Sequence, residues 1–122
     1  MKVKLVELVN SKEVLNELIN SDIPVQTSYK LSCYDEDINS ELTAYEKTRI
    51  KLVKKYGRDI GGGNFEVNRD DKESLEKFVN DINPVLETEV DLKDVSKIDI
   101  SDLGNNFSIS PNKLKRLHWL FK

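Results

Sequence analysis

The sequence has few of the residues that cross-link, bind metals or catalyse. Cys33 is the only cysteine and His118 the only histidine among 122 residues. A single cysteine excludes an internal disulfide and is typical of a reducing compartment. One histidine without a second histidine or a cysteine beside it disfavours a zinc site. We therefore expect Cys33 to be a core or half-buried thiol, His118 to be an ordinary surface or half-buried residue, and no cofactor to be needed.

Long apolar runs are also missing. No stretch approaches the roughly 20 apolar residues that span a bilayer, and the N-terminal MKVKLVELV is too short and too charged for a signal peptide. Hydrophobic residues make up 38% of the chain and charged residues 34%. These proportions favour a single domain over residues 1–122 with a modest core. We expect a protein that is made and kept in the cytoplasm.

The net charge of −3 is unevenly spread along the chain. Residues 1–65 carry ten acids and ten bases, residues 66–102 carry twelve acids and five bases, and residues 103–122 carry four bases and no acid. This pattern favours electrostatic docking to another protein. Nucleic-acid binding is disfavoured because it prefers a strongly basic domain, although the bases from Lys47 to Arg58 form the densest cluster.

Apolar periodicity predicts an α+β fold. Alternating residues indicate short strands at 2–6, 65–68, 89–92 and 97–100, and the glycines at 61–63 indicate a turn. Helical spacing predicts helices at 11–20 and 27–56, a third capped by Asp70 or Asp71, and a last one opened by Ser110-Pro111. We expect a helical hairpin with one long helix, packed with two further helices and a small, mostly antiparallel sheet of three or four strands.

The predicted helix over 27–56 carries a long apolar stripe. A 30-residue helix is about 45 Å long, which is more than one small domain covers. Part of it must therefore pack on another helix or on a partner, and self-association is one such outcome. The expected partner-binding residues are Tyr34, Ile38, Leu42, Tyr45, Leu52 and Tyr56. Tyrosines suit such a surface because each combines apolar area with a polar tip. The sequence leaves open which of the six face the core.

One segment of this helix partly matches a calcium loop. Asp35, Asp37, Asn39 and Glu46 fall at positions 1, 3, 5 and 12 of an EF-hand loop. Position 6 is Ser40, where the sharp turn of the loop needs glycine, and the chain has no second loop to pair with. The alternative is that these residues lie on the solvent face of a continuous helix. The unbroken apolar stripe favours the helix, so no metal is expected.

The basic C-terminal segment, KLKRLHWLFK, has an apolar side that includes Trp119 and Phe121. Such a segment inserts into a membrane surface or a partner groove, or it closes the domain's own core. We favour the core, because a core this small needs Trp119 and Leu120.

The order of these segments resembles a known family. The chain reads KVKLVEL, DIPVQTSYKLS, ELTAYEKTRIKLVKKYG, ETEVDL and ISPNKLKRLHWLF, with a glycine turn, a strand and a helix before ETEVDL. This resembles a family of small phage and prophage proteins of unknown function from low-GC Gram-positive bacteria. The acidic DED at 35–37 and the shortened region after Gly63 depart from that pattern. The resemblance implies a phage-encoded protein located in the host cytoplasm or the virion, and it supplies no catalytic residues.

The sequence thus favours a non-enzymatic phage structural, assembly or accessory protein that acts through protein–protein contacts. Its partner would be a phage structural protein or a host protein. The alternative is an inhibitor of a host defence system, in which the acids of residues 66–102 occupy a basic nucleic-acid-binding surface.

Overall fold

Helices dominate the computed structural model, which describes every residue from Met1 to Lys122. The elements in chain order are β1 (Lys2–Lys4), α1 (Leu5–Ile19), α2 (Val25–Tyr56), β2 (Arg58–Gly61), β3 (Asn64–Glu66), α3 (Lys72–Leu86), β4 (Glu89–Asp91), the 3-10 helix η1 (Ile100–Leu103) and α4 (Pro111–Arg116). The predicted α+β class with one long helix is confirmed. None of the helices combines the length and the apolarity needed to cross a bilayer.

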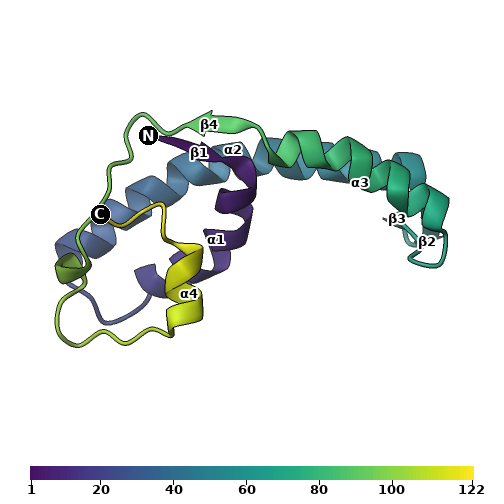
Figure 1. The fold of residues 1–122 in the computed structure, drawn as a ribbon. Coiled ribbons are helices and arrows are strands. Elements are labelled where there is room, and N and C mark those ends of the chain that lie inside the picture. The colour runs from purple at the N-terminus through teal and green to yellow at the C-terminus, as the bar shows by residue number, and fades with distance from the viewer.

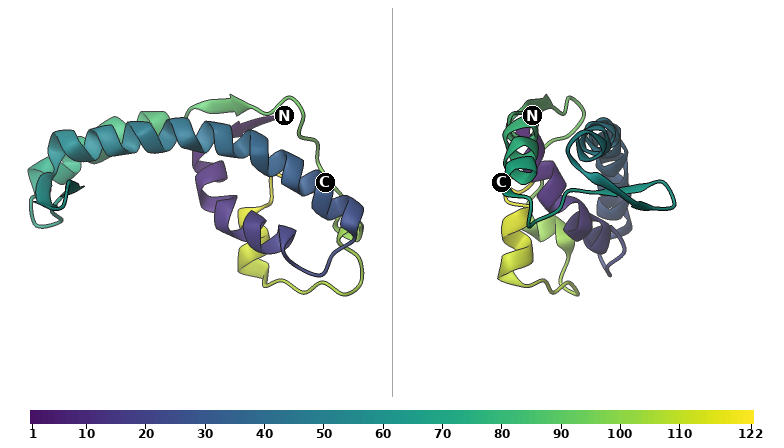
Figure 2. Two further views of the ribbon diagram at one scale, coloured as in Figure 1. Left: turned by 180° about the vertical axis from the view of Figure 1, so that it is seen from behind. Right: turned by 90° about the vertical axis from the view of Figure 1, so that its right-hand side faces the viewer.

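The molecule consists of a head and an arm (Figure 1). We define the head as residues 1–45 and 87–122, which include both termini, and the arm as residues 46–86. The arm contains the C-terminal end of α2, the β2–β3 hairpin and α3. The 32 residues of α2 run through both parts and, at 1.5 Å per residue, span about 48 Å. Figure 2 shows the arm projecting from the head with the hairpin at its far end.

The hydrophobic core lies in the head. Eighteen buried apolar side chains form one cluster, and all of them come from residues 3–38 and 90–120. The N-terminal strand is held here, because Val3 of β1 pairs with Val90 of β4 in an antiparallel register. Near the C-terminus, the Ile98 N–H donates to the Leu120 carbonyl at 2.9 Å. The core therefore joins sequence segments that the arm separates.

The strands form two separate two-stranded antiparallel ribbons instead of one sheet. β1 pairs with β4 in the head, and β2 pairs with β3 at the arm tip. The two ribbons lie at opposite ends of α3, so they are apart in space (Figure 1). The strand expected at 97–100 is reduced to a single bridge between Ile98 and Phe121, since η1 begins at Ile100.

Helix α1 begins at Leu5, six residues before the predicted start at residue 11. The predicted strand over 2–6 ends at Lys4, because Leu5 and Leu8 extend the buried helical stripe that continues through Leu15 and Leu18. Ser11 is not a cap. Its hydroxyl is buried inside the helix and donates to the Glu7 carbonyl at 2.7 Å.

The later helices follow their expected start signals. The Asp71 carboxylate caps α3 by accepting from the Ser74 N–H at 3.2 Å, and Pro111 opens α4. Helix α3 continues past Pro84 to Leu86. Helix α4 is shorter than the apolar pattern indicated and ends at Arg116. Leu117, Trp119 and Leu120 follow in a turn and are buried in the head core, where the sequence expected them.

Candidate partner-binding site

The arm carries apolar side chains that have almost no core of their own. Ile82 is its only buried residue, and it lies outside the core cluster of the head. Four apolar arm residues are exposed: Ile50 by 43%, Ile60 by 54%, Phe65 by 36% and Val79 by 39%. Two helices and a hairpin offer too few layers to cover both sides of α2, so the arm leaves apolar surface open to solvent.

The six partner-binding residues expected from the sequence do not form one exposed surface. Tyr34 and Ile38 belong to the head core, with exposures of 5% and 1%. Leu42 and Tyr45 are partly buried against that core at the base of the arm. Leu52 and Tyr56 are half-buried in the arm itself. The stripe is therefore one helix face, as the spacing predicted, and most of it packs inside the chain.

Tyr34 is fixed by polar contacts in the head. Its hydroxyl lies 3.0 Å from the Ser96 Oγ and accepts the Ser96 N–H at 3.3 Å. Burial alone would raise the pKa of Tyr34, but the hydrogen bonds with Ser96 and the nearby charge of Lys30 outweigh burial, and the pKa is lowered. These contacts give Tyr34 a role in joining α2 to the segment after β4.

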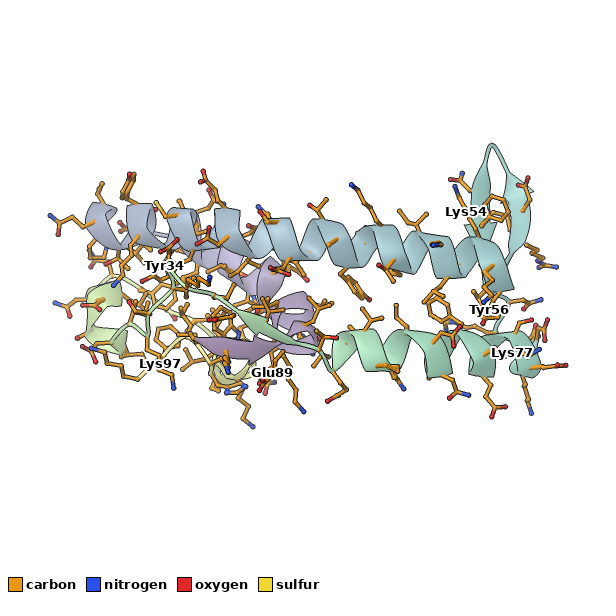
Figure 3. The ribbon with its side chains drawn as sticks, turned by 90° about the horizontal axis from the view of Figure 1, so that it is seen from above. Tyr34, Lys54, Tyr56, Lys77, Glu89 and Lys97 are labelled. Atoms are coloured by element: carbon orange, nitrogen blue, oxygen red, sulfur yellow. The ribbon has the colours of Figure 1, made fainter.

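Tyr56 links the two helices of the arm. Its hydroxyl donates to the Asp81 carboxylate on α3 at 2.5 Å. In Figure 3, Tyr56 lies on the side of α2 that faces α3, while Lys54 lies on the side that faces the hairpin. The C-terminal end of α2 thus has one face closed by α3 and another partly closed by the hairpin.

The α2 end of the arm is strongly basic. Residues 47–58 contain six bases and no acid. Of these bases only Arg49 forms an ion pair, with Glu46, and its hydrogen bonds lower the pKa of that carboxyl. Two lysines lie over aromatic rings instead: Lys54 is 5.9 Å from the Phe65 ring centroid and Lys55 is 5.1 Å from that of Tyr56.

The hairpin begins at a close approach between chain segments. A Cβ on Gly57 would lie 2.4 Å from the Val53 carbonyl oxygen and 2.7 Å from that of Glu66. Only glycine fits there without displacing backbone. The tip then turns through Gly61, Gly62 and Gly63, all with positive φ, which glycine adopts at little cost.

A groove opens between α2 and this hairpin, and we call it the arm-tip groove. Its volume is about 290 Å³. The lining residues are Arg49, Ile50, Val53, Lys54, Gly63, Asn64 and Phe65. Ile50 and Phe65 were not predicted as site residues, because Ile50 is out of phase with the apolar stripe and Phe65 matched an ordinary strand. The signal in the sequence was Ile50, an apolar residue between two bases, Arg49 and Lys51.

The calcium-loop interpretation is wrong. Asp35, Asp37, Asn39 and Glu46 all lie within the unbroken helix α2, so their backbone cannot wrap around a cation. Asp35 pairs with Lys12 of α1, and Glu46 pairs with Arg49. No group of three or more His, Cys, Asp or Glu side chains comes together in a way that could hold a metal ion.

The two residues with the strongest intrinsic reactivity lie in the head. Cys33 is exposed on α2, which corrects the expectation of a core or half-buried thiol. Leu31 and Tyr34 lie on the buried face of α2. Cys33 comes between them in sequence but lies off that face, so its thiol does not reach the core. His118 is 65% exposed and lies 3.1 Å from the Glu7 carboxylate.

Comparisons with protein-family models, curated proteins and solved structures found no match to this chain.

Proposed function

We propose that this protein is a non-enzymatic adaptor that acts through protein–protein contacts, with the arm as its contact element. The observation that carries the proposal is the arm itself. It projects from a head that holds the whole core cluster, and it leaves Ile50, Ile60, Phe65 and Val79 partly exposed. Four of the seven exposed large apolar side chains of the chain lie on this projecting element, and exposed apolar surface is typical of interaction sites.

Within this proposal, the protein is a phage-encoded structural, assembly or accessory component that is made in the host cytoplasm. The partner is a phage structural protein, a host protein or a second copy of the chain. Light scattering at increasing protein concentration distinguishes the last case: a dimer lost on substitution of Val79 by aspartate supports self-association through the arm, and a monomer at all concentrations contradicts it.

Photo-crosslinking in producing or infected cells tests the role of the arm. A photoreactive amino acid placed at Ile60 samples the arm, and one at Ile100 samples the head. The two positions form a matched pair, because their side chains are 54% and 58% exposed. We expect protein adducts from Ile60 and from Val79, and few from Ile100. Adducts from Ile100 alone, or none from any position, would contradict the proposal.

The inhibitor function is a second candidate, and one observation favours it. All twelve acids of residues 66–102 are exposed. That segment follows α3 and β4 along one edge of the molecule, from the arm tip back to the head (Figure 1). A row of carboxylates along an edge can oppose a basic channel. Salt-sensitive binding to a host nuclease would support this candidate, whereas stable incorporation into virions would contradict it.

A further inference from the structure

We propose that the arm-tip groove binds an acidic segment of a partner protein, and that one large apolar side chain of that segment inserts into the groove. This inference rests on the proposed function and adds the chemistry of the partner. The groove lies between α2 and the β2–β3 hairpin. Its volume of about 290 Å³ is at the low end of the range for small-molecule sites, about 300–1,000 Å³. An open groove of this size suits a single side chain better than a cofactor.

Five of the six bases of residues 47–58 have no ion-pair partner in the chain, and one of them, Lys54, lines the groove beside the paired Arg49. Lys47, Lys51, Lys54, Lys55 and Arg58 all lie on the α2 end of the arm without an ion-pair partner, and Arg49 alone is paired. Carboxylates of a bound segment would supply a counter-charge to Lys54 at the rim and to the other unpaired bases at this end of the arm. Such charges speed encounter and exclude partners of the wrong sign.

The basic segment of the head differs in this respect. Lys113 pairs with Glu17 at 2.8 Å, and Lys122 pairs with Asp99 at 3.5 Å. Two of the four bases of residues 103–122 are therefore paired within the chain, whereas only one of the six bases of residues 47–58 is paired. Lys115 and Lys122 border the apolar pocket beside α4, and Lys122 is the paired one of the two.

The walls of the groove supply the apolar contact. Ile50 from α2 and Phe65 from the hairpin both line it and keep 43% and 36% of their surface exposed. Lys54 sits over the Phe65 ring, so its aliphatic stem adds to the apolar wall while its ammonium group stays at the rim. An inserted side chain would cover Ile50 and Phe65, and it would exclude water from the nearby charge pairs, as in the centre of a protein interface.

A protein segment fits this site better than nucleic acid does. The whole arm carries nine bases and eight acids, and residues 70–76 of its α3 side hold four acids and one base. A polyanion that followed the basic end of α2 would meet these acids, whereas nucleic-acid sites present an extended basic surface. A peptide places its carboxylates only where the bases are.

The test is an NMR titration of the full chain at low ionic strength, where screening is weak. The probes are acidic peptides of Asp and Glu with one central Leu, Ile or Phe. The same peptides with serine at the centre, a basic peptide with a central Phe, and oligo-dT serve as comparisons. We expect at least one acidic apolar peptide to shift the amide signals of Ile50, Val53, Lys54 and Phe65. Its serine counterpart should bind roughly tenfold more weakly, the loss typical of removing one anchor residue.

Variants at exposed positions make the test specific. Lys54→Glu and Ile50→Ser should each weaken the acidic peptide roughly tenfold. Ile60→Ser, on the hairpin outside the groove, and Lys97→Glu, on the head, should leave binding unchanged. Trp119 fluorescence checks that each variant keeps the folded head.

Three outcomes would overturn the inference: no acidic peptide shifts the groove signals, the basic peptide binds equally well, or oligo-dT binds more tightly. If any of these occurs while Ile60 still crosslinks to protein in cells, the adaptor function stands and only the partner chemistry is wrong. If Ile60 gives no adduct either, both proposals fail.

Discussion

Replacement of Ser11 by alanine tests how the two ends of the chain are held together in the head. Ser11 is the only buried polar residue, and 1% of its surface is exposed. Its hydroxyl accepts the Trp119 Nε1–H at 3.3 Å and donates to the Glu7 carbonyl. Alanine removes the acceptor and leaves the indole N–H of Trp119 buried without a partner.

The expected cost is the balance of two terms. A stranded buried donor costs about 1–3 kcal/mol. Alanine also has a better helix propensity than serine, which returns about 0.5 kcal/mol within α1. The stranded donor dominates, so Ser11→Ala should destabilise the head by about 1.5 kcal/mol, or about 6 °C in Tm for a chain of this length. Ser32→Ala is the matched control, because the Ser32 hydroxyl donates only to the Ser28 carbonyl of its own helix, and it should change stability by less than about 0.5 kcal/mol.

Urea unfolding followed by the methyl NMR signals of Leu15, in the head core, measures these effects in every variant. A double-mutant cycle with Trp119→Phe isolates the hydrogen bond, because phenylalanine has no N–H to strand. In that background Ser11→Ala should cost nothing or stabilise slightly. An equal cost of Ser11→Ala in both backgrounds would refute the reasoning, because the loss would then be independent of the indole.

Three further predictions concern the arm. Hydrogen bonds from the Ser74 hydroxyl and the Ser74 N–H lower the pKa of the Asp71 carboxyl. The cap therefore stabilises α3 fully above the ordinary Asp pKa of about 3.9, and this stabilisation is lost as the pH falls through the lowered pKa. Amide shifts of the first turn of α3 should show the loss, and Asp71→Asn should remove the pH dependence. Gly57→Ala places a Cβ 2.4 Å from the Val53 carbonyl oxygen. Amide signals of the hairpin should shift widely, while the free energy of unfolding of the head changes by less than about 0.5 kcal/mol. A matching loss of stability in the head would contradict the separation of head and arm. Replacing residues 49–81 by a loop of about four residues, enough to join two antiparallel helices, should leave the urea midpoint of the head unchanged, and failure of that shortened chain to fold would show that the head depends on the arm.

Local signals in the sequence predicted the helices well where caps and periodicity agreed. The stripe from Leu31 to Tyr56 predicted α2, Gly57 marked its end, and Asp71 and Pro111 marked two helix starts. The start of α1 was missed because KVKLV fits a strand pattern as well as a helix start. The strand pairing was not predictable from local signals, since 84 residues of the chain separate β1 from β4.

The candidate site was predicted less well than the fold. The periodicity of α2 identifies a face but not what covers it. Tyr34 and Ile38 are part of the head core, while Leu52 and Tyr56 lie on the arm. The point at which α2 leaves the head depends on tertiary packing, which no helical spacing encodes. The arm-tip groove likewise depends on the hairpin folding back towards α2, which brings Phe65 near Lys54.

Amide hydrogen exchange of the free chain tests the central claim most directly, namely that the head holds the core and the arm is left open for a partner. Local stability follows buried apolar contacts. We predict slow exchange in α1 and in residues 31–40 of α2, and exchange faster by orders of magnitude in residues 47–56 and in α3. Equal protection along the whole of α2 and α3 would contradict the account, because the arm would then belong to the same cooperative unit as the head.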